Sequence, residues 1–209
     1  MRCFLKIRLL TLTNLNRYKN LLIKLRDTAN ECAREMQSND LEDTFFTRNA
    51  NFLTGSFVIS TCSYLESYLK DSVTDKISSF NERIENLGMP KSLVLWSVNP
   101  GQQGKQGKQS NLGIFKIDLT EDDIDRKTSP DIDKTIKLFS LLGIDLDSDD
   151  NFRDIKDRIG SIVDKRNQII HHNNDASDIS VLDAISYINT VIEYIEILDK
   201  NFWQSLYIS

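Results

Sequence analysis

Residues 150–171, DNFRDIKDRIGSIVDKRNQIIH, determine the kind of fold that this sequence can form. Apolar residues recur in this stretch at spacings of three and four, which predicts an amphipathic helix with one buried face. These positions are Ile155, Ile159, Ile162, Val163, Ile169 and Ile170. The following residues, 172–175, are His-Asn-Asn-Asp, a run typical of turns, so we expect the helix to end near His171. Such a helix must pack against other helices.

Three further segments have the same periodicity, at about 15–36, 44–87 and 180–202, and a shorter one spans about 131–142. The chain contains only 8 Gly and 3 Pro, which argues against an all-β fold. The sequence therefore predicts an all-α fold with four long helices, with residues 1–209 forming a single domain.

Two local signals place helix ends. Gly88 and Pro90 predict that the second helix stops near residue 87. The spacing of Ser180 and Asp183 resembles a capping box and predicts the start of the last helix.

An insertion of about residues 89–130 separates the second and third long helices. Residues 93–98 form a short apolar run, and residues 115–119 alternate apolar and polar side chains, which is typical of a half-buried strand. The tract between them, 101–110, is rich in Gly, Gln and Lys and lacks the Gly-Lys-Ser/Thr ending of a phosphate-binding loop. We therefore expect a β-hairpin with a solvated polar tip.

Composition excludes several classes of protein. The formal net charge of -5 argues against a dedicated duplex-binding domain, which usually has a basic surface. No apolar run reaches 18 residues, so we expect no membrane span. Cys3, Cys32 and Cys62 form no close pair and no metal-ligand spacing, and the apolar run at the N-terminus is interrupted by charges. We therefore expect a cytoplasmic, reduced protein without a cofactor.

The two histidines of the chain, His171 and His172, are adjacent at the end of the predicted third long helix. Histidine exchanges protons near neutral pH, and Arg166, five residues earlier, carries a permanent planar charge suited to phosphate oxygens. With no third Cys or His nearby, a zinc site is not expected. One interpretation is that a histidine is the base and Arg166 the phosphate-binding cation of an RNA-cleaving site. The alternative is that the histidines are surface residues at a frayed helix end.

Helical geometry limits how this pair can act. Residues five apart on a helix are separated by about 140°, so Arg166 and His171 do not share a face. Asn167 lies one turn before His171 and is placed to hydrogen-bond its ring. A complete site therefore needs a second copy of the motif or another element facing it.

The apolar stripe of the second helix runs from Phe52 through Cys62 to Ile84, and burial is expected along it; Glu66 interrupts this stripe. A buried carboxylate without a partner costs several kcal/mol, and Arg166 is similarly placed on its own helix. Two compatible interpretations remain: a core ion pair that fixes helix register, or an acid that orients Arg166 toward a phosphate.

The Arg-Asn-x-x-x-His pattern from Arg166 to His171, followed by an apolar helix, resembles the HEPN superfamily. The segments Tyr64–Leu69 and Ile162–Asn167 resemble the Leu-Glu-containing helix and the approach to the motif in that superfamily. The insertion and the Lys137–Ile144 segment after it resemble the RiboL-PSP-like branch. The resemblance covers most of residues 15–200.

This resemblance implies an all-α, four-helix, up-and-down bundle, usually dimeric, in which two motifs face each other across a cleft. It also implies a metal-independent endoribonuclease that cleaves single-stranded RNA, often as a toxin or phage-defence effector. Carried over by position, Arg166 and His171 are the catalytic pair, Asn167 is the polar residue after the arginine, and Glu66 is the supporting acid.

Lys165 and His172 flank the pair and are candidate substrate-binding residues. A tyrosine that some relatives carry two residues after the histidine is replaced by Asn173, so control by modification of that tyrosine is in doubt. The partners expected are RNA, a second copy of the chain, and an antitoxin or defence-system protein. The rival hypotheses are a catalytically inactive module that binds RNA, a nucleotide or a partner protein, and a purely structural dimer.

Overall fold

The computed structural model describes residues 2–38, 44–98, 113–171 and 176–204, with side chains from residue 14 onward. Within these ranges the secondary structure is helical, apart from one isolated β-bridge. None of the helices in these ranges is both long and apolar enough to cross a lipid bilayer.

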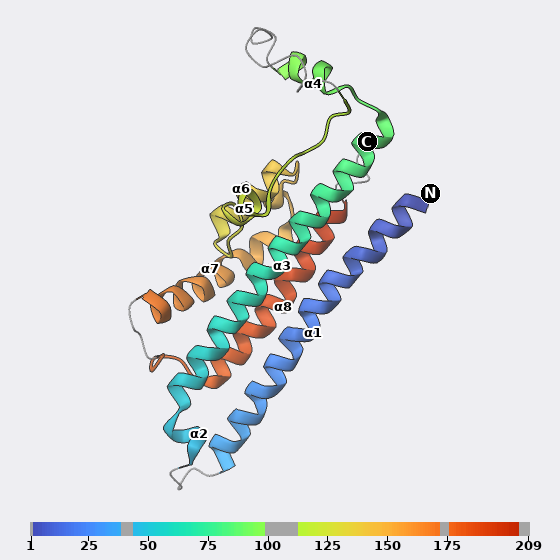
Figure 1. Cartoon of the computed structure of the whole chain (residues 1–209). Coiled ribbons are helices and arrows are strands. Elements are labelled where there is room, and N and C mark those ends of the chain that lie inside the picture. The colour runs from blue at the N-terminus through green and yellow to red at the C-terminus, as the bar shows by residue number, and fades with distance from the viewer. Residues whose placement is uncertain (1, 39–43, 99–112, 172–175, 205–209) are drawn as a thin grey trace.

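Four long helices form an up-and-down bundle (Figure 1): α1 (Arg2–Ser38), α3 (Ala50–Leu87), α7 (Asp150–His171) and α8 (Val181–Gln204). Helices α1, α3 and α8 pack against one another, and α7 packs against α3 and α8. The predicted all-α, four-helix fold is confirmed.

Tyr68 of α3 lies at the centre of the core and joins three helices. Its ring meets the edge of the Tyr18 ring of α1, with centroids 6.0 Å apart, and its hydroxyl donates to the carbonyl of Ile195 in α8 at 3.2 Å. The Tyr18 hydroxyl donates in turn to Asp71 at 2.7 Å. Burial of each large apolar side chain in this core contributes about 1.5–3 kcal/mol. Packing and a few directed hydrogen bonds therefore fix the register of the bundle.

The local signals at the helix ends are confirmed, with one exception. Gly88 ends α3 with a φ of 60°, and Ser180 and Asp183 form the reciprocal hydrogen bonds of a capping box before α8. The predicted second helix is in fact broken at Asn49, because a separate short helix, α2 (Phe45–Arg48), precedes α3.

The expected β-hairpin in the insertion is wrong for the described residues. Residues 93–98, expected as one of its strands, belong to a helix, α4 (Lys91–Val98). Pro90 immediately precedes this helix and its fixed φ suits a helix start, while the apolar run has no strand-like alternation. The remaining pairing is one antiparallel bridge between Pro90 and Ile114. The expected tip, residues 101–110, lies outside the described residues.

The returning chain, residues 115–119, is extended but lies against a helix instead of a strand. The amide of Asn81 in α3 donates to the carbonyl of Ile117 at 2.9 Å, and its oxygen accepts from the Ile117 N–H at 2.7 Å. Side-chain hydrogen bonds thus replace the pairing that a hairpin would have supplied. Two short helices and a 3₁₀ turn then lead to α7: α5 (Glu121–Asp125), α6 (Ile132–Leu141) and η1 (Leu146–Ser148).

Lys76 of α3 is fully buried at the end of α8. Its ammonium donates to the carbonyl of Phe202 and lies over the rings of Phe80 and Trp203, 5.4 and 5.2 Å from their centroids. Burial lowers the pKa of Lys76 to about 8. The last turn of α8 is therefore capped by a lysine held between aromatic rings.

Asp199, near the end of α8, is the carboxylate most affected by burial. Burial raises its pKa to about 6, although Trp203 Nε1 and the Tyr68 hydroxyl donate to it at 3.3 and 3.4 Å and lower the pKa. Because the folded pKa exceeds the ordinary value of 3.8, the folded state binds the proton more tightly than the unfolded state.

Asp199→Asn is therefore expected to raise the free energy of unfolding at pH 7.5 by about 1–2 kcal/mol and to change it little at pH 4. The stabilising contribution of the Asp199 proton is complete below the unfolded pKa and is lost as the pH rises through about 6. Urea unfolding of both proteins across this pH range measures the difference. Glu193→Gln, an exposed carboxylate on the same helix, is the matched control. A difference that does not change with pH would contradict this assignment.

Candidate functional site

The candidate site lies where the C-terminal part of α7 packs against α3 (Figure 1). The helices approach closely at Gly55 of α3, where an added Cβ would lie 3.6 Å from Cγ2 of Ile169 and from Cβ of Ala176. Ala176, five residues before α8, is buried and has a φ of 58°. This packing sets the position of Arg166, three residues before Ile169.

The guanidinium of Arg166 is held by two neighbours and retains some contact with solvent. Nη1 donates to Oδ1 of Asn167 at 3.1 Å, and Nη2 lies 4.0 Å from Oε2 of Glu66. The side chain of Arg166 is 24% exposed, and Nε is buried with no hydrogen-bond partner among the described residues. The pair with Glu66 predicted from the sequence is thus present, at the outer limit of an ion pair.

Glu66 is not buried as its position on the apolar stripe suggested, because 46% of its side chain is exposed. It lies at the edge of the face that α3 turns toward α7, where water reaches the carboxylate. A half-exposed pair at 4.0 Å contributes little to stability. An incoming anion can therefore compete with Glu66 for the guanidinium.

Cys62 lies one turn before Glu66 and is completely buried. Burial raises the pKa of its thiol to about 12; the nearby charge of Arg166 lowers it and that of Glu66 raises it. Cys62 is thus a buried apolar side chain beside the ion pair, as its position predicted, and is not a nucleophile.

His171 is the last residue of α7 and is exposed to solvent. The expected hydrogen bond from Asn167 to its ring is absent from the described contacts, because the Asn167 side-chain oxygen accepts from Arg166. The side chains of Arg166 and His171 start on different sides of the helix, about 140° apart around its axis and about 7.5 Å apart along it. Asn167 therefore orients the arginine.

Lys165 is buried, and its ammonium forms an ion pair with Asp178 in the loop that leads to α8. This contact ties the loop to α7, so in this arrangement the Lys165 charge is not presented to a substrate. His172, the other candidate for substrate binding, lies outside the described residues.

A comparison with known families identifies the family of this chain. The model of the RiboL-PSP-HEPN family matches residues 13–204, which include α3, α7, α8, most of α1 and the candidate site. The chain belongs to this family. No curated protein and no solved structure matches the chain at a significant level.

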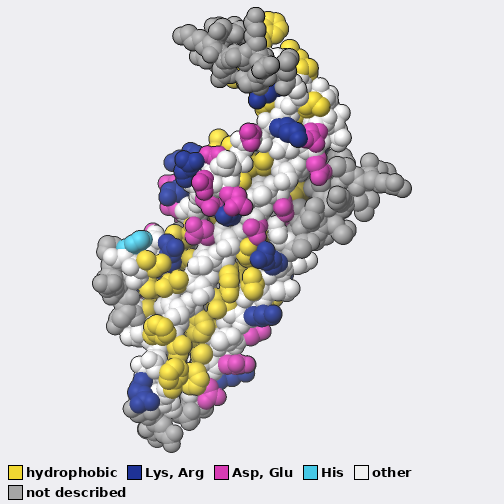
Figure 2. Space-filling model, in the orientation of Figure 1, with side chains coloured by type: hydrophobic (Ala, Val, Ile, Leu, Met, Phe, Trp, Pro, Cys, Tyr) yellow, Lys and Arg dark blue, Asp and Glu magenta, His cyan; other side chains and the backbone are white. Residues whose placement is uncertain are grey.

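The HEPN bundle also carries an exposed apolar face beside the candidate site. Phe52, Ile59 and Glu66 are seven residues apart and therefore lie along one side of α3; Phe52 is 73% exposed. Ile170 lies one turn after Arg166 on α7 and is 39% exposed. Figure 2 shows hydrophobic side chains gathered on this side of the molecule, near the histidine.

The apolar periodicity of α3 predicted that Phe52 is buried, so this exposed surface was not expected from the sequence. The sequence signal was Glu66 itself, because an acid on the same side of a helix as Phe52 indicates that this side meets water. Among the described residues, no group of three or more His, Cys, Asp or Glu side chains is arranged to hold a metal ion.

Proposed function

We propose that this HEPN protein is an endoribonuclease that cleaves single-stranded RNA through attack of a ribose 2'-hydroxyl on its own phosphate. The observation that carries the proposal is the arrangement at the end of α7. An accessible imidazole, His171, follows a partly exposed guanidinium, Arg166, which Asn167 and Glu66 orient. Residues of the same types and spacing resemble the superfamily's catalytic motif.

In this reaction His171 accepts the proton of the 2'-hydroxyl, and the 2'-oxygen attacks the adjacent phosphorus. The bond from phosphorus to the 5'-oxygen breaks, and that oxygen takes up a proton. Negative charge develops on the non-bridging oxygens, where the guanidinium of Arg166 stabilises it. The products are a 2',3'-cyclic phosphate and a 5'-hydroxyl. Because the substrate supplies its own nucleophile, the protein needs to supply only a base, a cation and an acid.

We further infer that the acting unit is a homodimer. One helix presents Arg166 and His171 on different sides, so a second motif facing the first would supply the groups that one chain cannot bring to a phosphate. The exposed apolar face of Phe52 and Ile170, beside the candidate site, supports this arrangement. The partner's His171 would then protonate the leaving 5'-oxygen.

The biological role that best fits this chemistry is that of a cytoplasmic toxin or phage-defence effector. A nuclease without sequence readout harms its own cell unless it is restrained, so an antitoxin or a defence-system protein is the expected partner. This part of the proposal rests on the family alone.

A catalytically inactive helical module that binds RNA, a nucleotide or a partner protein is the second candidate. Two observations favour it: Glu66 already pairs with the guanidinium of Arg166, and Asp178 already pairs with the ammonium of Lys165. The chain is also acidic overall. Such a module would bind its ligand without altering it.

The deciding experiment incubates the purified protein and a chelator with single-stranded RNA or with DNA of the same sequence. Cleavage of RNA in the presence of chelator, with DNA left intact, is the expected result, because DNA lacks the attacking hydroxyl. Cleavage of DNA, or loss of RNA cleavage on chelation, would contradict the proposal. Binding of RNA without cleavage would favour the inactive module.

A further inference from the structure

The insertion forms an exposed apolar arm, which we define as described residues 87–98 and 113–114. None of the eight residues of α4 is buried, although five of them are apolar. The large hydrophobic side chains of the arm are strongly exposed, with Trp96 at 52%, and include Leu87, Met89, Leu93, Val98 and Ile114. Figure 1 shows α4 beyond the end of α3. An isolated surface of this kind usually marks an interface.

The arm also differs in charge from the rest of the chain. From residue 86 to residue 117 the sequence contains no Asp or Glu and four lysines, Lys91, Lys105, Lys108 and Lys116, in a protein with a net charge of -5. Of these, Lys91 lies in the described arm beside the apolar residues of α4, whereas Lys116 lies outside the arm and pairs with Glu85. A partner for this surface must therefore offer apolar contact together with negative charge.

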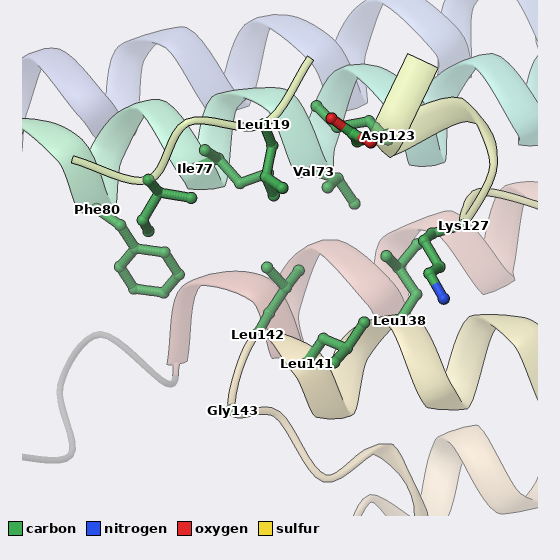
Figure 3. Close-up of a pocket in the computed structure, with 12 residues that line it drawn as sticks. Val73, Ile77, Phe80, Leu119, Asp123, Lys127, Leu138, Leu141, Leu142 and Gly143 are labelled. Carbon is green, nitrogen blue, oxygen red and sulfur yellow. The ribbon is translucent and has the colours of Figure 1, made fainter. Parts of the chain in front are cut away.

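The same molecule contains an apolar pocket of about 410 Å³ between α3, the extended residues 117–119, α5 and the end of α6 (Figure 3). Val73, Ile77 and Phe80 form its α3 side. Leu119 and Leu141 lie at its edge and are 51% and 71% exposed. The pocket is large enough to take an aromatic side chain and is open to solvent.

An acidic segment borders one side of this pocket. The segment from residue 118 to residue 125 contains five carboxylates and no basic residue. Asp123 is paired with Arg126, and Asp125 with Lys70. The other three, Asp118, Glu121 and Asp122, are exposed and have no ion-pair partner in the part of the chain that the structure describes. Lys127 also lines the pocket, so the rim is negative only on the side of residues 118–122.

We propose that the arm of one copy of this protein docks into this pocket of a second copy. The apolar arm matches the apolar pocket in polarity, and Lys91 of the arm matches in charge the carboxylates of residues 118–122 beside the pocket. The pocket of the same chain is not covered by its own arm, since α4 lies beyond the end of α3, away from α5 and α6 (Figure 1). Docking places Trp96 in the pocket, with Lys91 near the acidic rim. Each copy inserts its arm into the pocket of the other copy. This contact is separate from the exposed apolar face of Phe52 and Ile170.

Fluorescence of Trp96 tests this docking directly. The chain has two tryptophans, and Trp203 is replaced by Phe so that Trp96 alone reports. As the concentration of this protein rises, the Trp96 emission should shift to the blue, because its ring leaves water. Leu141→Asp, which alters only the pocket edge, should abolish the shift and weaken association by about tenfold or more in sedimentation velocity. Leu182→Asp is the control, since Leu182 is similarly exposed but lies outside the pocket and the arm.

Mixing two defective proteins distinguishes a second copy from every other partner. A copy with Leu141→Asp has an altered pocket but an intact arm, and a copy with Trp96→Asp has an altered arm but an intact pocket. Adding the second to the first should restore the blue shift and part of the association. Adding a copy with both substitutions should restore neither. Higher salt, about 0.5 M, should weaken the recovered association.

The proposal is overturned if Trp96 emission does not change with protein concentration, or if the shift persists in Leu141→Asp. It is also overturned if only anionic vesicles or RNA produce the shift. None of these measurements requires RNA cleavage, so their outcome does not depend on the proposed nuclease activity.

Discussion

His171→Ala is expected to lower the rate of RNA cleavage by about 100- to 10,000-fold without altering the fold. The imidazole is the base for the 2'-hydroxyl, and no other described histidine can replace it. His171 is exposed at the end of α7 and its removal leaves no cavity, so stability should be unchanged. Single-turnover cleavage rates and thermal unfolding of the variant and the parent protein measure the two effects.

The matched variant for this experiment is His171→Asn, which keeps a polar side chain but cannot act as a base at neutral pH. It should be as inactive as His171→Ala. Retention of more than about a tenth of the parent rate by either variant would exclude His171 as the general base.

Arg166→Ala is expected to reduce cleavage by about 100- to 1,000-fold, and Arg166→Lys should recover little of it. The planar guanidinium reaches both Asn167 and Glu66 and can still face a phosphate, whereas a lysine offers a single point charge. Cleavage rates for the three proteins, together with their melting temperatures, provide the measurement.

Glu66→Gln separates a structural role of Arg166 from a chemical one. Since Glu66 is half exposed and 4.0 Å from the guanidinium, its loss should change the melting temperature little and activity far less than Arg166→Ala does. If Arg166→Ala instead lowered the melting temperature strongly and left activity unaffected, the ion pair would serve only the core.

The parts of the fold that the sequence predicted are those governed by local rules. The bounds of α7 and α8 follow from apolar periodicity, a turn-forming run after His171 and a capping box at Ser180. Gly88 ends α3 because a left-handed residue is needed there and glycine adopts that conformation without strain. Each signal lies within a few residues of the boundary that it sets.

The insertion could not be predicted in the same way. A six-residue apolar run such as 93–98 is compatible with a strand or a helix, and residues 115–119 alternate as a strand would. Their actual conformations depend on contacts distant in sequence, such as the two hydrogen bonds between Asn81 and Ile117. Phe52 was misplaced for a related reason, since periodicity shows that a helix has an apolar side but not which part of that side is covered.

The candidate site was predicted in part. The pairing of Arg166 with Glu66 followed from their similar places on two helices that had to pack together. The partners of Asn167 and Lys165 did not follow, because side-chain orientation depends on the loop after α7, which brings Asp178 to Lys165. Arg166 and His171 start on different sides of one helix, and the described part of the chain offers no second histidine as the acid, so a second copy is proposed to supply it.

Mass spectrometry of the cleaved RNA ends tests the central claim most directly. Attack by the 2'-hydroxyl at a phosphate bound by Arg166 and His171 predicts a 2',3'-cyclic phosphate on one fragment and a 5'-hydroxyl on the other, in the presence of chelator. A 3'-hydroxyl together with a 5'-phosphate would show that water attacked the phosphorus, and would contradict the mechanism proposed for this protein.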